Sequence, residues 1–340
     1  MRPSFSCCLV NDTFGDPGLY VEIAWARRAL LFDLGQNFSL GATRLLRAQD
    51  IFISHTHMDH FIGFDQVLRV ALGRGKTLRL YGPPGLSANV DGKLRGYTWN
   101  LVDGYPLTIE VREFDKDRMQ ATTFHAAEAF TMRRAHTQPA ITPAADGAFS
   151  VLEDPMFTVK AVALNHRIPS FAYALEEQFH VNILRERLHG AGLPVGSWLK
   201  DVKQYLWQGK PDEFRFTATL YFEHRREERV FVLGEVRERF VRITRGQKIA
   251  YVVDARYDEE NEAKIVALAR GADIFYCEAP YLEADADKAR DRYHLTARQA
   301  GVMARKAEVQ KLVVFHFSPR YTGQGEFIEH EALCAFMGSE

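Results

Sequence analysis

Four residues with metal-binding side chains stand within one stretch of six positions: His55, His57, Asp59 and His60. In an extended segment His55 and His57 point to the same side, because side chains alternate with a period of two. Imidazole and carboxylate groups are common ligands of Zn²⁺ and similar divalent ions. The two alternating histidines can share one ion, and the following aspartate and histidine can bind a second. The alternative is a polar turn of hydrogen-bonded histidines, but four such residues rarely gather by accident.

The flanking sequence predicts how this cluster is held. Residues 51–53 form a short apolar run of β-branched and aromatic side chains, which is typical of a buried strand. After the cluster, apolar residues recur at helical spacing through residues 59–73. We therefore expect the end of a strand and the start of a helix to present the ligands.

Three further apolar runs end in a residue of the same chemical kind. His166 follows the run at 162–164 and Asn165, Asp254 follows 251–253, and His316 follows 312–315. Each is a candidate ligand, because a strand end repeats the arrangement seen at residues 51–60. Asp258 is an alternative to Asp254 as a carboxylate that bridges two ions. It lies, however, at the start of the helix predicted over 258–270.

His294 lies just before Thr296, which together with Gln299 matches a capping box. A helix is therefore expected to start there, and His294 should hold a fixed position outside its end. His125 and His136 are isolated from any ligand spacing, and we interpret them as structural or solvated.

The bulk composition limits the class of protein. The chain has 340 residues, of which 46% are hydrophobic, so it can bury a substantial core. A net charge of −1 excludes a global basic field for nucleic acid, although a local patch is compatible with it. The four cysteines show no metal-binding spacing, and neither a signal peptide nor a membrane span is evident. We expect a cytoplasmic protein that does not enter a membrane.

The remaining pattern predicts one α/β domain over residues 1–340 with an inserted arm. Residues 177–214 break the strand pattern and carry two apolar helical stripes, so we expect an inserted helical arm there. The first stripe is Val181, Leu184 and Leu188, and the second is Trp198, Leu199, Val202, Tyr205 and Leu206. A plain connector packed on the core is the alternative. Residues 215–222 and 229–233 are expected to form a hairpin, and 135–150 a surface loop. The other predicted strands are 19–24, 29–33, 78–81, 107–114, 119–125, 128–134, 157–164 and 273–278.

The H-x-H-x-D-H string at residues 55–60 resembles the signature of the metallo-β-lactamase superfamily. That resemblance implies a four-layer αββα sandwich with the site at the strand ends between two sheets. It also implies that Asp33, two residues before Gly35, supports the metal loop from behind, although an ordinary turn residue explains Asp33 equally well.

Other stretches are similar to the ribonuclease Z branch of that superfamily. The matching segments lie within residues 29–321. They are 164–166 and the nearby 170–173, then 254–256, 277–280, 294–300 and 316–321. The resemblance implies an endonuclease that acts on the 3′ side of tRNA precursors, and members are often homodimers.

The resemblance also assigns roles to the candidate residues. His55, His57 and His166 would bind one Zn²⁺, and the second would be held by Asp59, His60 and His316, with Asp254 as the bridge between them. Mn²⁺ or Fe²⁺ are alternatives to zinc. Asp59 would orient the attacking water or take its proton, and His294 would stabilise the charged transition state or protonate the leaving oxygen.

Two other function classes stay open at this point. The same hydroxide chemistry would serve a hydrolase of a small phosphodiester or of a carboxylic ester or thioester. A non-catalytic nucleic-acid-binding relative would be expected to have lost ligands, and none of the seven candidates is missing.

Overall fold

The computed structural model describes residues 3–339 except 25, 116–117, 135–146 and 224. His136 and most of the loop predicted at 135–150 therefore lie outside the described residues. The chain divides into two compact units. The larger unit comprises Phe5–Val151, Val159–Leu175 and Lys248–Glu340, and the smaller comprises Met1–Ser4, Leu152–Thr158 and Glu176–Gln247.

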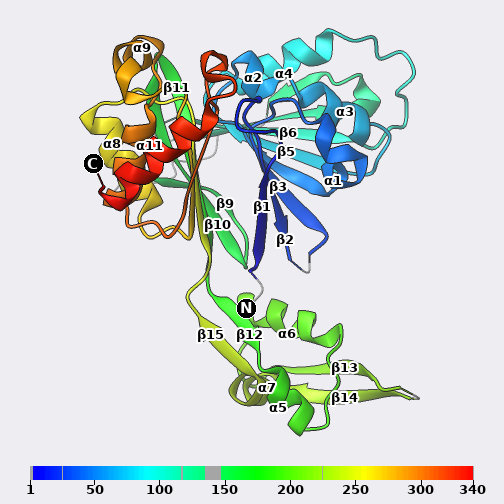
Figure 1. Ribbon diagram of the computed structural model, residues 1–340. Coiled ribbons are helices and arrows are strands. Elements are labelled where there is room, and N and C mark those ends of the chain that lie inside the picture. Colours follow the sequence, from blue (N-terminus) through cyan, green and yellow to red (C-terminus); the bar gives the residue numbers. More distant parts are fainter. Residues whose placement is uncertain (1–2, 25, 116–117, 135–146, 224, 340) are drawn as a thin grey trace. The chain divides into compact units, whose positions relative to one another are not determined.

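Two β-sheets form the centre of the larger unit (Figure 1). The first sheet has the strand order β1 Phe5–Leu9, β2 Leu19–Ile23, β3 Arg28–Phe32, β4 Ala48–Phe52, β5 Thr77–Gly82, β6 Thr108–Asp115, β7 Arg118–His125 and β8 Met132–Arg134. The second has the order β18 Leu312–Phe315, β17 Ile274–Glu278, β16 Lys248–Val252, β11 Ile168–Glu177, β10 Phe157–His166 and β9 Phe149–Glu153. Strands β3 to β6 run parallel, and so do β16 to β18.

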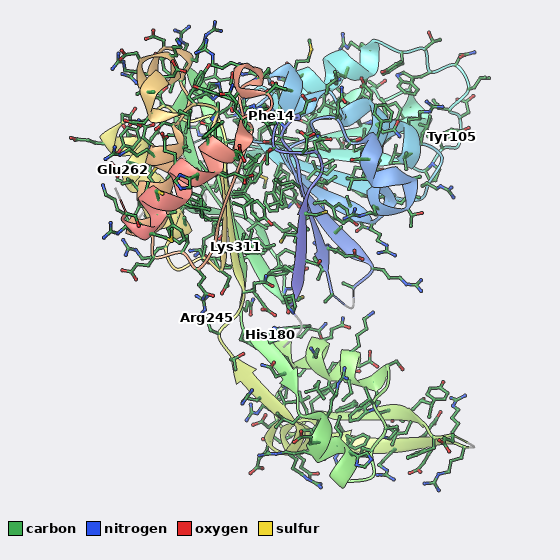
Figure 2. The ribbon with its side chains drawn as sticks, viewed as in Figure 1. Phe14, Tyr105, His180, Arg245, Glu262 and Lys311 are labelled. Atoms are coloured by element: carbon green, nitrogen blue, oxygen red, sulfur yellow. The ribbon has the colours of Figure 1, made fainter. Side chains whose placement is uncertain are left out.

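Aromatic side chains join the inner faces of the two sheets, and side chains fill the space between them (Figure 2). The Phe32 and Phe52 rings of the first sheet lie 5.8 and 5.6 Å from the Tyr173 ring of the second, and Phe32 lies 5.8 Å from Tyr251. The Tyr173 hydroxyl donates to the Ile53 carbonyl over 2.7 Å, so its polar atom is paired inside the core.

Helices cover the outer face of each sheet (Figure 1). The helices packed on the first sheet are α1 Gly41–Arg47, α3 Phe64–Ala71 and α4 Leu86–Arg95. Those packed on the second are α8 Glu259–Ala269, α10 Ala297–Lys306 and α11 Gly325–Met337, with α9 Ala286–Arg292 before α10. This arrangement confirms the predicted four-layer αββα sandwich.

The sequence predicted the start of α10 correctly but missed a break in the helix expected over 59–73. The capping box is present, since Thr296 Oγ1 accepts from the Gln299 backbone N–H and Gln299 Oε1 accepts from that of Thr296. The helix predicted over 59–73 is wrong in one respect, because it divides into α2 Met58–Phe61 and α3. A Cβ atom at Gly63 would lie 2.1 Å from the Gly35 carbonyl oxygen, so the chain bends where the two backbones meet.

The smaller unit has its own core. Its elements are β12 His180–Ile183, α5 Arg185–Gly190, α6 Trp198–Trp207, β13 Arg215–Tyr221, β14 Arg226–Val232, α7 Leu233–Phe240 and β15 Val241–Thr244. Strands β13 and β14 form the predicted hairpin, whereas Val181, expected on a helix, lies in β12. Trp198 stacks on Phe231 with the ring centroids 5.1 Å apart. Residues 177–214 thus share a core with 215–247, and we propose that the predicted arm extends over all of Glu176–Gln247.

Within the described part of the chain, no helix has both the length and the apolar character needed to span a bilayer.

Candidate metal centre

Parallel strands bring the candidate residues to one edge of each sheet, because their carboxyl ends lie side by side. In the first sheet β3 is followed by Asp33, and His55 comes three residues after β4. In the second sheet Asp254 lies just beyond β16, Glu278 ends β17 and His316 directly follows β18. The pattern of apolar runs ending in ligand-type residues therefore reflects parallel pairing.

The other candidates come from elements outside these parallel strands. His57 is the residue before α2, the four-residue helix that carries Asp59 and His60. His166 ends β10. His294 lies between α9 and α10.

Asp254 is at the centre of the cluster. Its Oδ2 atom lies 3.4 Å from His55 Nε2, 3.2 Å from His166 Nε2 and 3.5 Å from His60 Nε2, and its Oδ1 atom lies 3.1 Å from His316 Nδ1. One carboxylate therefore reaches four imidazoles contributed by both sheets.

Three overlapping groups of ligand-type residues share this neighbourhood. Within each group, one potential ligand atom per residue lies within 4.8 Å of all the others. The first group is His55, His57, His166 and Asp254; the second is Asp59, His60 and His316; the third is Asp254, Glu278, His294 and His316. The structure thus brings the seven candidate ligands together at one place, with Glu278 and His294 beside them in the third group.

The histidine rings are oriented from behind by hydrogen bonds through their Nδ1 atoms. His60 Nδ1 donates to Asp33 Oδ2 over 3.0 Å, and His166 Nδ1 donates to the Tyr293 carbonyl over 2.8 Å. The Ser54 hydroxyl donates to Asp33, so it accepts from His55 Nδ1 at 3.1 Å. Each ring therefore turns its Nε2 atom toward Asp254, as ligating histidines do.

Asp33 occupies the supporting position that the sequence resemblance implied. Its carboxylate also accepts from the Ser54 backbone N–H over 2.7 Å and from the Tyr251 hydroxyl over 3.0 Å. It is fully buried and accepts four hydrogen bonds, so it fixes the loop that carries the first histidines.

Several buried atoms in the cluster have no hydrogen-bond partner within the described residues. They are His55 Nε2, His60 Nε2, His316 Nδ1 and Asp254 Oδ1; the last two lie 3.1 Å apart but lack the angles of a hydrogen bond. Unpaired buried polar groups are costly, and these four belong to residues that could hold an ion. The donor set, imidazole nitrogen and carboxylate oxygen, fits a divalent cation of the zinc type.

The pKa shifts point to the same need for positive charge. Burial lowers the pKa of His55, His57 and His166, which favours the neutral, ligating form of the ring. Burial alone would also lower the pKa of His60 and His316, but the Asp254 carboxylate and its neighbours raise both well above the usual value. The carboxylates thus draw protons onto these two rings, and a bound cation would supply that positive charge instead.

The backbone is strained where it turns into the centre. Asp33, Asp254 and His316 have φ values of 59°, 48° and 62°, in the left-handed region that residues with a Cβ rarely adopt. Such conformations cost about 1–3 kcal/mol each and are typical of functional sites.

Glu278 is the residue that the ligand assignment from sequence left out. It is fully buried, and it accepts from His294 Nδ1 over 2.8 Å and from the backbone N–H groups of Ala255 and Leu295 over 3.0 and 3.2 Å. The sequence contains the same signal for Glu278 as for Asp254 and His316. All three residues come at or just after the end of an apolar strand, namely β17, β16 and β18. Glu278 therefore belongs to the same strand-end set.

His294 lies before the start of α10, as the capping box predicted, and belongs to the same group of ligand-type residues as Asp254, Glu278 and His316. Its Nδ1 atom is 3.6 Å from Asp254 Oδ1, and 19% of its side chain is exposed. Burial alone would lower its pKa, but the charge and hydrogen bond of Glu278 raise it. His125, by contrast, lies on β7 with its Nδ1 atom 3.1 Å from Thr108 Oγ1, in keeping with a structural role.

No family model matches the chain. It is, however, 32% identical over 325 residues to the ribonuclease Z of Deinococcus radiodurans, which covers 93% of this chain and 91% of the relative. The ribonuclease Z of Bacillus velezensis is 28% identical, over 92% of this chain and 86% of the relative.

Solved structures agree on the fold. The short form of human tRNase Z is 19% identical with a TM-score of 0.50, covering 94% of this chain and 92% of that one. A metallo-β-lactamase fold protein from Bacillus subtilis is 13% identical with a TM-score of 0.55, covering 98% and 93%. The strand-end cluster of histidines and aspartates, the αββα sandwich and the match along most of the chain agree, and the chain belongs to the ribonuclease Z family.

Proposed function

We propose that this chain is a metal-dependent endoribonuclease that cleaves a phosphodiester bond on the 3′ side of tRNA precursors. Family membership supports this activity, because relatives over most of the chain are named ribonuclease Z. The observation that carries the proposal is the convergence of seven histidine and aspartate side chains from both sheets, with four buried polar atoms left unpaired.

We infer that the cluster holds two Zn²⁺ ions. One would be bound by His55, His57 and His166, and the other by Asp59, His60 and His316, with Asp254 between them. When bound, such ions lower the pKa of a water molecule and neutralise charge on the phosphodiester.

The chain's own residues supply the remaining functions. Asp59 is part of α2 at the margin of the cluster, where its carboxylate could orient the attacking water or accept its proton. His294, held by Glu278 and partly exposed, is placed to protonate the leaving oxygen or to stabilise charge in the transition state. A fixed ring beside the cluster needs no reorientation at the moment of reaction.

Two arginines next to the cluster favour an anionic substrate. Arg167 directly follows His166, and Arg256 lies two residues after Asp254. Their guanidinium carbons lie 4.7 and 5.4 Å from the centroid of the Tyr293 ring. The Nε atom of Arg256 is buried, and it has no hydrogen-bond partner among the described residues. These groups could pair with phosphates on either side of the bond that is cleaved.

Turnover of a precursor tRNA with a 3′ trailer, measured beside a bis-nitrophenyl phosphodiester and an aryl ester, tests the proposal. We expect metal-dependent cleavage of the precursor that is lost in Asp254→Asn and kept in the control Asp291→Asn, whose side chain belongs to an exposed residue. Hydrolysis of the small diester or the ester without any cleavage of precursor tRNA would instead favour a small-substrate hydrolase.

Elemental analysis of the freshly purified protein tests the number of ions. Two zinc ions per chain are expected, and His57→Ala and His316→Ala should each lower the content. Full activity with a single bound ion would reject the two-ion arrangement.

A further inference from the structure

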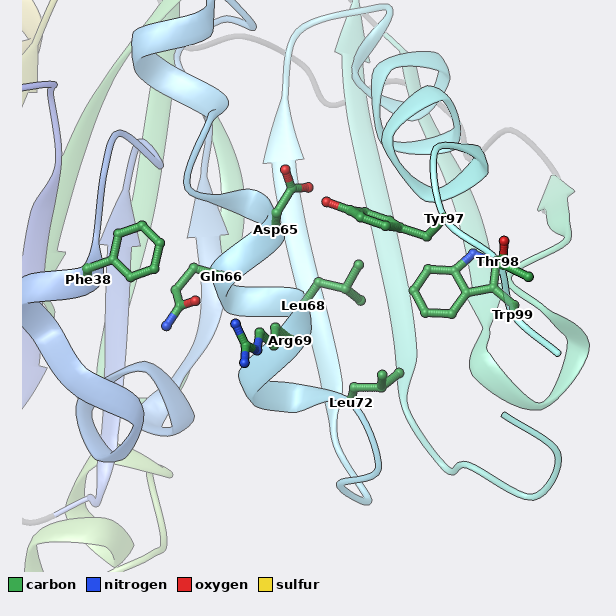
Figure 3. A pocket seen from close by; sticks show the side chains of 9 residues that line it. All are labelled: Phe38, Asp65, Gln66, Leu68, Arg69, Leu72, Tyr97, Thr98 and Trp99. Carbon is green, nitrogen blue, oxygen red and sulfur yellow. The ribbon is translucent and has the colours of Figure 1, made fainter. Parts of the chain in front are cut away.

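A hollow of about 490 Å³ lies on the surface of the larger unit, over helix α3 (Figure 3). Three separate segments form it: Phe38 from the turn before α1, Asp65, Gln66 and Arg69 from α3, and Tyr97 and Trp99 from the loop after α4. Its volume is in the range of roughly 300–1,000 Å³ that is usual for small-ligand pockets.

Two of the aromatic rings are unusually exposed. Phe38 is 71% exposed and Tyr97 is 48% exposed, although burial would stabilise both. Trp99 lies on the Tyr97 side of the hollow and is held in place, because its Nε1 atom donates to the Leu94 carbonyl over 2.8 Å and its ring packs against Phe130 at 4.7 Å. The Tyr97 ring lies edge-on to Trp99 with 5.7 Å between centroids. The hollow therefore has aromatic rings on two opposite sides.

Polar groups from one face of α3 lie between these rings. In Figure 3 the Gln66 and Arg69 side chains lie between Phe38 on one side and Tyr97 on the other. Asp65 Oδ2 pairs with Lys93 Nζ at 3.1 Å, and the Tyr97 hydroxyl points toward the same carboxylate, so Asp65 already has partners within the hollow. Gln66 and Arg69 offer an amide and a guanidinium beside an aromatic face, which are groups that bind the edge and the face of a nucleobase.

The hollow is close to the candidate metal centre along the chain. Asp65 is six residues after Asp59, a separation that even a fully extended chain spans in only about 20 Å. A single-stranded segment held at the centre can thus reach α3 within a few nucleotides.

We propose that this hollow is a binding site for one unpaired base of the RNA substrate, a few nucleotides from the bond that is cleaved. The proposal rests on the function proposed above. The base would stack on Phe38 and be read at its edge by Gln66 and Arg69, whose side chains lie next to that ring.

The test uses the full-length metal-loaded protein and its Phe38→Ala variant. Leu101→Ala is the matched control, because Leu101 is 79% exposed and does not line the hollow. The first measurement is binding of short single-stranded RNAs that carry the fluorescent base aminopurine at successive positions. We expect fluorescence quenching at one position, and binding weakened by about 5- to 150-fold in Phe38→Ala, as stacking energies of about 1–3 kcal/mol per base imply. Leu101→Ala should bind like the wild type.

The second measurement is cleavage of precursor tRNA with an abasic nucleotide placed at each trailer position in turn. At the position that is quenched, the abasic substitution should raise KM in the wild type and have no further effect in Phe38→Ala. Equal loss at every position, or no loss in Phe38→Ala, would overturn the proposal. So would a change of sedimentation mass in Phe38→Ala with RNA binding intact, since the hollow would then bind a second copy of the chain. Normal quenching without cleavage of any precursor would refute the proposed function and leave the base site standing.

Discussion

His294 and Glu278 form a pair in which a buried carboxylate fixes the orientation of a partly exposed ring. Because Glu278 also accepts two backbone N–H groups, its position is determined by the fold and not by the imidazole. A residue held in this way should act on the chemical step and contribute little to metal binding.

We expect His294→Ala to keep its metal content and fold normally while kcat falls by roughly 10²–10⁴-fold, the usual range for loss of a general acid. The loss should be smaller for a substrate with a nitrophenolate leaving group, because that group needs no proton. Steady-state kinetics on both substrates, together with metal analysis, check this. Loss of an ion would make His294 a ligand, and unchanged activity would leave it only a residue flanking a helix.

Glu278→Gln is predicted to lower kcat toward the value of His294→Ala, because an amide cannot accept from all three N–H groups in the same way. If Glu278 acts through the ring, the double variant should be no slower than the slower single variant. Glu329→Gln, at an exposed residue of α11, provides a control for loss of a carboxylate outside the centre. Additive losses in the double variant would show that the two residues act independently.

Four candidate ligands, His55, His166, Asp254 and His316, could be predicted from sequence because each comes at or just after the end of a strand, and the other three lie within five residues of His55. The pairing of Glu278 with His294 could not, since it depends on a contact across 16 positions between a strand end and a loop. The left-handed conformations of Asp254 and His316 also leave no trace in the sequence, because neither residue is a glycine.

At the scale of elements, the sequence pattern identified α6 and the three strands that lead into Asp254, Glu278 and His316. It failed at Gly63, where contact with the Gly35 carbonyl interrupts an apolar pattern that continues through the break. It also failed at Val181, because a short apolar run fits a strand as well as a helix. In both cases a tertiary contact determined the local structure.

The contact between α10 and α11 depends on Gly301. A Cβ atom there would lie 2.2 Å from the Ala332 carbonyl oxygen and 2.7 Å from Ala335 Cβ. We predict that Gly301→Ala lowers the free energy of unfolding by about 1–3 kcal/mol, although alanine favours a helix.

Gly92 on α4 is the matched control for this substitution. No atom lies within 4 Å of a Cβ placed there, so Gly92→Ala should raise the free energy of unfolding by up to about 1 kcal/mol. Urea unfolding of both variants measures the two effects. A stabilised Gly301→Ala would mean that the two helices are less closely packed.

At the scale of the whole molecule, the unit Glu176–Gln247 can be removed at a defined point. The Glu177 backbone N–H donates to the Gln247 carbonyl over 2.8 Å, so the two ends of the segment are neighbours. Neither core cluster of the larger unit includes a residue of 176–247. A deletion limited to 177–214 would instead leave Phe216, Leu220 and Phe240 without their core partners.

If the unit holds the RNA, replacing residues 178–246 with two glycines should abolish cleavage of precursor tRNA. The metal content and the hydrolysis of a bis-nitrophenyl phosphodiester should be nearly unchanged, because the candidate centre lies entirely outside the deleted segment. Parallel turnover assays on both substrates measure this. An equal loss on both would indicate that the unit supports the larger one structurally.

The separation in sequence of His55 and His316 has a consequence for the synthesis of the protein. Because β18 is the edge strand of the second sheet and leads directly into His316, no nascent chain that ends before this residue carries the complete ligand set. At ~5–20 residues per second, the interval between translation of the two histidines is roughly 10–50 s. On the ligand assignment proposed above, loading of the full centre with metal would be a late event, and nascent chains that end before His316 would lack one ligand of the second ion.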